Sequence, residues 1–191
     1  MTIFMHATLT PVPGRLTDLA DTVAWLKKGL ERSGMTLRRA WASTSGGPGT
    51  MVDLWELPDA NTLVDALTAA AAHPRHDETM AELATVLDDE VLRLLSPAPH
   101  CSDFRPAGGS RCLQVTYRVG YGGARAAWAQ LPAPEGWHLA GAFETTLGDL
   151  CEIVEMWELP DGADASALGG ALPPTVRARS TVELEPLAWS L

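Results

Sequence analysis

The stretch Trp55-Glu56-Leu57-Pro58-Asp59 occurs a second time in the chain, as Trp157-Glu158-Leu159-Pro160-Asp161. The match continues upstream without a gap, so that residues 34–59 align with residues 136–161 at a constant offset of 102, which is 161 minus 59. Outside the pentapeptide the identical positions are Gly34, Leu37, Ala40, Thr44, Gly46 and Val52. A fixed period of this kind is typical of an internal repeat. The sequence therefore predicts two copies of one structural unit.

Each copy shows the order strand, helix, strand, strand, helix, strand. In the first copy, β-forming residues and helical apolar spacing predict strands at 3–10, 37–43, 50–57 and 90–95, and helices at 16–32, 59–73 and 77–87. In the second copy they predict strands at 112–119, 137–145, 151–159 and 181–187, with shorter helices at 124–131 and 163–168. This order is that of a ferredoxin-like unit.

Local signals refine the helices. Asp59 is expected to be an N-cap, because its carboxylate can accept hydrogen bonds from the first backbone N–H groups. Helical spacing predicts an inward apolar stripe on each of the two later helices of the first copy: Leu63, Val64, Leu67, Ala70 and Ala71, then Met80, Leu83, Ala84 and Leu87. Four tryptophans at repeat-equivalent places are expected to pack in the core: Trp25, Trp55, Trp128 and Trp157.

A four-stranded antiparallel sheet with helices on one face leaves its other face apolar and exposed. Packing two such sheets together buries both faces. The predicted fold is therefore α+β, with tandem ferredoxin-like units whose sheets form an α/β barrel within one chain. Residues 1–97 are expected to form the first unit, the Pro- and Gly-containing residues 98–110 a linker, and residues 111–191 the second unit with shortened helices.

Composition excludes several functions. The 191 residues carry a net charge of −10, which disfavours non-specific binding to nucleic acid or to an anionic membrane. No apolar run approaches the ~20 residues that a membrane span requires, and the start of the chain lacks the pattern of a signal peptide. Three sparse cysteines favour reduced thiols in the cytoplasm. Abundant Ala, Gly, Pro and Arg with only two lysines fit a GC-rich bacterial genome.

Two stretches support a resemblance to a known family. Residues 139–150 (LAGAFETTLGDL), continuing through Val154-Glu155-Met156-Trp157-Glu158, resemble the NIPSNAP family of the dimeric α/β-barrel superfamily. The first copy resembles it through His73-Pro74 and residues 90–97 (EVLRLLSP). The resemblance implies a superfamily that includes cofactor-free oxygenases, polyketide cyclases, small isomerases and haem-binding dismutases. It supplies no family-wide catalytic motif for these positions.

Four residues are candidate catalytic groups: His6, Asp53, Glu155 and Tyr117. His6 lies in the middle of a strand and could act as a general base near neutral pH, unless backbone or water satisfies its ring. Asp53 and Glu155 are equivalent acids, each on the same strand face as the tryptophan two residues later. Burial without a partner would raise their pKa values into a catalytic range, whereas pairing with an arginine would make them structural. The phenol of Tyr117, toward the end of a strand, could stabilise an oxyanion.

Candidate substrate-binding residues are Trp41, Trp55, Arg39 and Phe143, of which Trp41 could form the wall of a pocket for a flat aromatic molecule. The pair His73 and His76 followed by acids is weak as a metal site, because Pro74 interrupts helical geometry. Haem would need an axial ligand, and no attachment motif is present. No metal or organic cofactor is expected.

These observations lead to alternative functions. The first is a cofactor-independent enzyme that oxygenates, cyclises or isomerises an aromatic or polyketide-type natural product, with His6 or Asp53 as base in a cavity of the first unit. The second is a ligand-binding or accessory module, which an exposed apolar patch would favour. The third is a haem protein. The expected partner is a small aromatic or polyketide-like ligand, with no nucleic acid or membrane, and the chain would be a monomer or a homodimer.

Overall fold

The computed structural model describes residues 2–45, 49–106, 110–168 and 171–190. Eight strands are present in these ranges: β1 (Ile3–Pro11), β2 (Thr36–Ser43), β3 (Met51–Leu57), β4 (Leu87–Pro97), β5 (Cys112–Val119), β6 (His138–Leu147), β7 (Glu152–Glu158) and β8 (Val176–Pro186). The helices are α1 (Leu16–Arg32), α2 (Ala60–Ala71), α3 (His76–Leu83) and α4 (Ala124–Trp128), with 3₁₀ helices η1 (Ala165–Leu168) and η2 (Ala188–Ser190). The predicted α+β class is confirmed.

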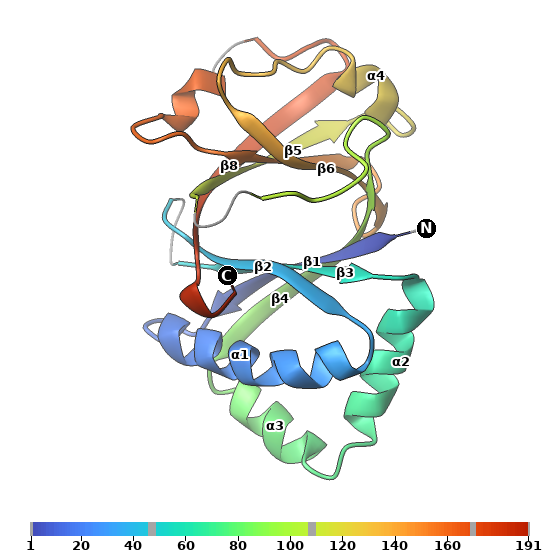
Figure 1. The fold of residues 1–191 in the computed structure, drawn as a ribbon, viewed down its shortest axis with the longest axis vertical. Coiled ribbons are helices and arrows are strands. Elements are labelled where there is room, and N and C mark those ends of the chain that lie inside the picture. The colour runs from blue at the N-terminus through green and yellow to red at the C-terminus, as the bar shows by residue number, and fades with distance from the viewer. Residues whose placement is uncertain (1, 46–48, 107–109, 169–170, 191) are drawn as a thin grey trace.

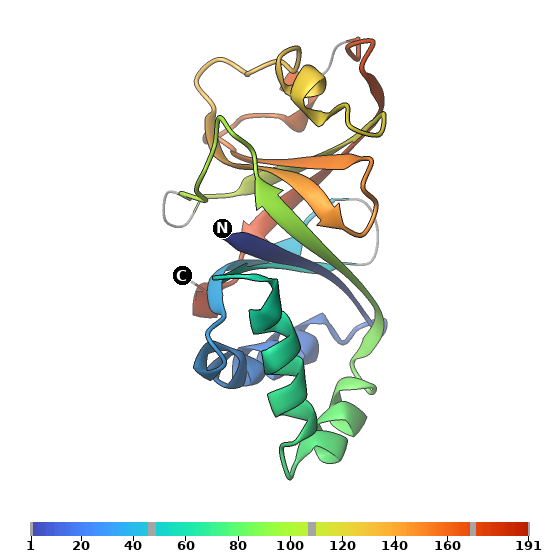
Figure 2. The same ribbon diagram turned by 90° about the vertical axis from the view of Figure 1, so that its right-hand side faces the viewer.

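The strands form one closed antiparallel barrel in the order β1-β3-β2-β8-β5-β7-β6-β4. Each half contributes four strands, and the two halves join where β2 pairs with β8 and where β4 pairs with β6. The last strand of each half therefore hydrogen-bonds to the other half. Figures 1 and 2 show the two halves stacked one above the other, with α1, α2 and α3 below the strands of the first and α4 above those of the second. Closure leaves no long sheet edge unpaired.

The connections that follow β4 and β8 repeat the duplication. After β4, the backbone N–H of Ala98 donates to the carbonyl of Ala142. After β8, the N–H of Leu187 donates to the carbonyl of Ala40. Ala40 and Ala142 are equivalent, since they differ by the repeat offset of 102. In each half, the residue after the last strand thus donates a backbone hydrogen bond to the equivalent alanine of the other half.

Side chains alternate between two environments along each strand. Inside the barrel, residues of both halves pack together, among them Phe4, Trp41, Leu54, Leu95, Phe143, Val154 and Met156. On the outer face of the first sheet, Met5, Ala7, Leu9 and Trp55 pack under the helices with Leu19 and Val23 of α1. On the outer face of the second sheet, loops with Trp137 and Leu172 and the short helices cover Ile153 and Trp157.

The helical layer differs from the sequence predictions in two respects: the helix predicted over residues 77–87 ends at Leu83, with Leu87 beginning β4, and several side chains predicted to be buried are exposed. Asp59 caps α2 as expected, accepting from the backbone N–H groups of Asn61 and Thr62. The predicted inward stripe of α2 is confirmed only for Leu63, which packs against the core. Val64 and Leu67 are 60% and 56% exposed, and Ala66 is the buried residue. Met80 and Trp25 are also about half exposed, so their predicted burial is wrong too. The long helix α1 already covers the sheet, and α2 descends beside it in Figure 1.

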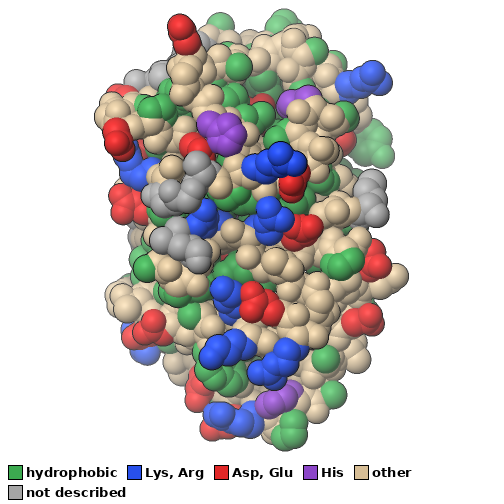
Figure 3. Space-filling view, viewed as in Figure 1, with side chains coloured by type: hydrophobic (Ala, Val, Ile, Leu, Met, Phe, Trp, Pro, Cys, Tyr) green, Lys and Arg blue, Asp and Glu red, His purple; other side chains and the backbone are tan. Residues whose placement is uncertain are grey.

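The helices and the surface charges bear on what the protein could bind. Within the described ranges, no helix has the length and apolar character needed to cross a membrane. In Figure 3, Lys and Arg side chains gather over the middle of the face shown, several beside Asp or Glu side chains. The acidic excess in the net charge of −10 therefore forms no continuous patch on this face.

Candidate functional site

Asp53 is the buried acid that lies against a cavity. It sits on β3 opposite Ala7 of β1, on the strand face that carries Trp55 and is covered by the helices. Its side chain is 3% exposed, and its Oδ1 has no hydrogen-bond partner among the described residues. Burial raises the pKa of this carboxyl to about 7, a hydrogen bond from Trp55 opposes that rise, and the charge of Glu90 adds to it. Asp53 can therefore take or give a proton near neutral pH.

The cavity lies between the first sheet and the helices and has a volume of about 90 Å³. Its walls come from β1, β3 and β4 on one side and from α1 and α3 on the other, through residues such as Val23, Leu30 and Leu83. Apart from Asp53 and Glu90, the residues around it are all apolar. A buried acid with a free oxygen and a raised pKa beside a cavity is a candidate general base.

His6 lies on the other face of the same sheet. Its neighbours on β1, Met5 and Ala7, face the helices, whereas Phe4 faces the barrel interior with His6. Its Nε2 lies 2.8 Å from Oε1 of Gln114 on β5, so that Nε2 carries the proton and His6 links the two halves. Burial lowers the pKa of His6 to about 4. His6 and Asp53, expected as alternative bases of one cavity, are therefore separated by the sheet.

Trp41 and Phe143 belong to the barrel interior rather than to a pocket wall. Both are buried against Phe104, whose ring is 6.1 Å from that of Trp41 and 6.4 Å from that of Phe143. The predicted grouping of Trp41 with Asp53 is wrong, because the two side chains lie on opposite faces of the sheet. Arg39 is nearly buried and lies near Cys112 of the same interior.

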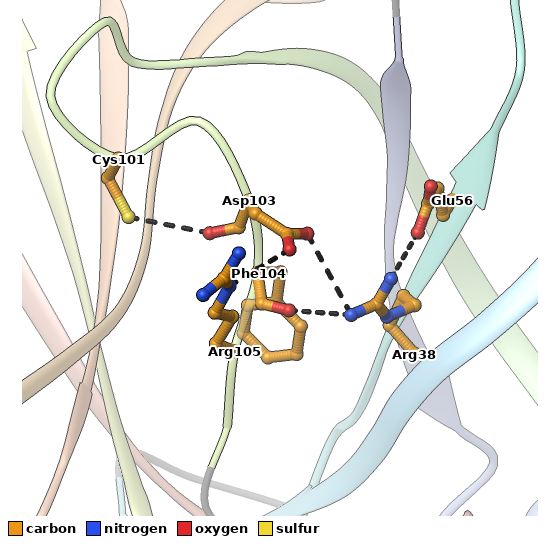
Figure 4. Close-up of polar contacts among 6 residues, drawn as sticks. All are labelled: Arg38, Glu56, Cys101, Asp103, Phe104 and Arg105. Carbon is orange, nitrogen blue, oxygen red and sulfur yellow. Dashed lines mark hydrogen bonds and ion pairs between the residues drawn. The ribbon is translucent and has the colours of Figure 1, made fainter.

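Phe104 comes from the segment predicted to be a linker without regular structure. Figure 4 shows how a charged cluster holds it: Arg38 pairs with Glu56 and donates from Nη2 to the carbonyl of Phe104 at 2.6 Å. Asp103 lies 3.9 Å from Arg38 and 3.1 Å from Arg105. Sequence analysis missed this residue, although an aromatic side chain in a Pro- and Gly-containing segment was a signal for it.

Glu155 repeats the position of Asp53 in the second half. The indole N–H of Trp157 donates to its Oε2 at 3.0 Å, and burial raises its pKa. Tyr117 is fully buried on the same face, and burial followed by the charge of Glu155 raises the pKa of its phenol. Tyr117 belongs to the same buried cluster as Ala124, Ala127 and Leu168. A phenol held protonated in a packed core is a poor candidate for catalysis.

A larger hollow of about 440 Å³ lies at the surface of the second half, between Pro99, His100, Arg125, Trp128 and Ala129. His100 and Arg125 are exposed there. The hollow has the size of a small-molecule site, but its buried polar atom, the indole Nε1 of Trp128, is neither an acid nor a base near neutral pH. Asp53 therefore remains the better candidate.

The cavity beside Asp53 does not fit haem. A haem iron needs an axial His, Cys, Met or Tyr, and only Met5 among the residues around the cavity is of these types. The volume of about 90 Å³ is also far below the roughly 300–1,000 Å³ of pockets for larger ligands. Elsewhere in the described parts of the chain, no three His, Cys, Asp or Glu side chains converge as metal ligands.

Comparisons with known proteins define the class of fold. No family model matches the sequence, and no curated protein matches it. A proposed monooxygenase from Lactobacillus acidophilus has a similar solved structure, with a TM-score of 0.60 and 11% identity over 97% of this chain and 93% of that one. Chlorite dismutase from Candidatus Nitrospira defluvii gives a TM-score of 0.61 and 10% identity over 98% and 92% of the two chains. The fold is that of the dimeric α/β barrels, built here from one chain.

NIPSNAP domain proteins are also among the similar structures. One from Burkholderia xenovorans is 21% identical and covers 54% of this chain and 100% of its own, with a TM-score of 0.46. Identities this low show likeness of fold and not of chemistry. The function therefore has to be argued from the site.

Proposed function

We propose that this protein is a small enzyme that removes a proton from a weakly acidic organic substrate in the cavity under α1, with Asp53 as the general base. The observation that carries this proposal is the free Oδ1 of Asp53, buried against an apolar cavity. The raised pKa of about 7 supports it, because a base titrating near the working pH combines a useful fraction of carboxylate with useful basicity.

The chemistry begins with one proton transfer. The Asp53 carboxylate takes a proton from a carbon next to a carbonyl, or from a phenol, and leaves an enolate or phenolate in the cavity. Return of the proton to another carbon is isomerisation, attack of the anion on a second carbonyl is cyclisation, and reaction with dioxygen is oxygenation. All three would tailor an aromatic or polyketide-type substrate without an organic cofactor. The apolar walls exclude water and strengthen the basicity of the carboxylate.

The volume restricts what can enter. A cavity of about 90 Å³ is smaller than the ~150 Å³ apolar cavity that holds benzene in another protein, so it holds a short acyl unit or part of a ring. A longer substrate would place only its reactive end beside Asp53. We also propose a cytoplasmic location, which the three free cysteines support.

Deuterium exchange tests the proposal without knowledge of the natural substrate. The protein would be added to 1-tetralone in D₂O near pD 7, and loss of the α-proton signal followed by NMR. We expect catalysed exchange by the wild type and a loss of about 100-fold or more in Asp53→Asn. Asp65→Asn makes the same chemical change on the exposed surface of α2 and should exchange at the wild-type rate. Equal rates in Asp53→Asn and the wild type would contradict the proposal.

A second candidate function is partner binding through the helical layer. Val64 and Leu67 lie one turn apart on α2 and are both more than half exposed. Such a pair favours an accessory role in which α2 contacts another protein. Light scattering on the wild type and on Val64→Asp would test it, since a self-association that the variant abolishes would support a contact through α2.

A further inference from the structure

The cavity contains two acids and no basic group. Asp53 on β3 and Glu90 on β4 flank β1, where their register partners are Ala7 and Leu9. Both side chains line the cavity with apolar residues around them. Neither acid forms an ion pair with any residue in the described ranges. The two carboxyls are therefore free to interact with a bound molecule.

The acids differ in depth. Asp53 is buried under the helices, whereas Glu90 belongs to the exposed part of β4. Partial burial followed by the charge of its neighbour Asp89 raises the pKa of Glu90. Glu90 therefore lies at the open side of the cavity and Asp53 at its closed side. A molecule that enters passes Glu90 before its inner end reaches Asp53.

This arrangement of two acids favours a cationic substrate over an anionic one. An anionic substrate would lose its hydration in an apolar cavity and meet two like charges with no cation to compensate. An ammonium group would meet an acid without a competing partner, and charge-assisted hydrogen bonds to carboxylates are the stronger kind. The apolar walls at the same time favour a hydrocarbon body between the two ends.

We propose that the substrate is a small apolar amine, whose ammonium group binds Glu90 at the mouth while its acidic proton faces Asp53. This inference rests on the proposed function of Asp53 and adds the class of substrate. Adjacent strands lie about 4.8 Å apart and alternate residues about 6.7 Å apart, which separates the two Cβ atoms by on the order of 12 Å. Both side chains reach inward from there, so the amine and the acidic proton lie a few bonds apart, as in a short aminoketone.

A matched series of ligands tests the charge preference directly. The probes are 2-phenylethylamine, 2-phenylethanol and phenylacetate, which share a ring and differ in charge. Binding to the wild-type protein at pH 7 would be followed by tryptophan fluorescence, since Trp55 lines the cavity. We expect the amine to bind at least 5-fold more tightly than the alcohol, and phenylacetate more weakly than both. In Glu90→Gln the affinity of the amine should fall to that of the alcohol, while Asp65→Asn should keep the wild-type order.

Three results would overturn the inference: equal affinities for the three probes, a preference for the amine that persists in Glu90→Gln, or no binding of any probe. These outcomes are separable from failure of the proposed function, because the exchange of uncharged 1-tetralone reports on Asp53 without an ammonium group. Asp53-dependent exchange with no amine preference would leave the general base and remove the amine. Amine preference without exchange would leave a binding site and remove the catalysis.

Discussion

Asp53 and Glu155 occupy the same position in the two halves, 102 residues apart, and each accepts a hydrogen bond from the tryptophan two residues further along its strand. The duplication has thus kept an acid and an indole together on the outer face of each sheet. The two acids differ in the side chains and helices that surround them. Asp53 lies beside a cavity under α1, whereas Glu155 is buried against Tyr117.

The first prediction follows from this difference. Glu155→Gln keeps the shape of the side chain and should leave the exchange of 1-tetralone at the wild-type rate, because no substrate reaches Glu155. Asp53→Asn should remove the exchange. Comparing the two exchange rates by NMR at one protein concentration shows which half of the protein holds the catalytic acid. A larger loss in Glu155→Gln than in Asp53→Asn would move the site to the second half.

The second prediction concerns the dependence of stability on pH. Asp53 has a pKa of about 7 in the folded protein, against an ordinary value of 3.8. Because the folded protein binds this proton more tightly than the unfolded chain, Asp53 lowers the free energy of unfolding as pH rises from about 4 to about 7. The full effect is on the order of 4 kcal/mol and persists at higher pH.

Asp53→Asn removes that effect. Urea denaturation of the wild type and the variant at several pH values should show the variant gaining relative stability between about pH 4 and pH 7, with a constant difference above. The other shifted carboxyls, Glu90 at the cavity and Glu155 in the second half, are present in both proteins, so their contributions cancel to first order. A difference that stays flat across this range would show that Asp53 is ionised in the folded protein at low pH.

The third prediction concerns His6, whose effect has the opposite sign. Its pKa is about 4 when folded and 6.5 ordinarily, so the unfolded chain binds the proton more tightly. The stability that His6 contributes is complete above pH 6.5 and is lost as pH falls toward 4, by about 3 kcal/mol. Arg93, the nearest charge, strengthens this effect by repelling a protonated ring.

Gln114→Met tests the structural role of His6. The variant leaves the Nε2 proton of His6 without an acceptor inside the barrel and should cost about 1–3 kcal/mol in urea denaturation at pH 7. Its rate of 1-tetralone exchange should match the wild type, because the pair lies on the far side of the sheet from Asp53. His6→Ala should likewise destabilise the protein without loss of exchange. Loss of exchange at unchanged stability would return His6 to the mechanism.

Much of the fold could be predicted because its signals are local or repeated. The offset of 102 gave the duplication, the alternation of side chains gave the strands, and Asp59 was recognisable as a cap from its own position. The exposure of Val64 and Leu67 could not be predicted, since apolar spacing defines a face of a helix but does not say whether the sheet has room for it. In this fold α1 already covers the outer face of the first sheet, so α2 cannot bury these side chains there.

The site was predictable only in part. Strand parity placed Asp53 and Trp55 on one face correctly, because the side-chain period of a strand is fixed. Parity could not show which face holds the cavity, nor that His6 meets Gln114, 108 residues away. Glu90 was no more than a residue at the start of a predicted strand. Its relation to Asp53 depends on the pairing of β4 with β1, which is a long-range property of the fold.

The fourth prediction concerns the close approach of Phe104 to β6. A Cβ atom at Gly141 would lie 2.8 Å from Cδ2 of Phe104 and 2.8 Å from the ring of Phe143. Gly141→Ala should therefore destabilise the protein by about 1–3 kcal/mol, because two buried rings cannot both move away. Gly29→Ala is the matched control: it lies within α1, and a Cβ there meets nothing within 4 Å. That substitution should stabilise the helix by roughly 0.5–1 kcal/mol. Thermal denaturation of the two variants should shift the midpoint in opposite directions. If Gly141→Ala were as stable as Gly29→Ala, the ring of Phe104 would not pack against β6. The hydrogen bond from Arg38 to the carbonyl of Phe104 would then not hold the ring in this position.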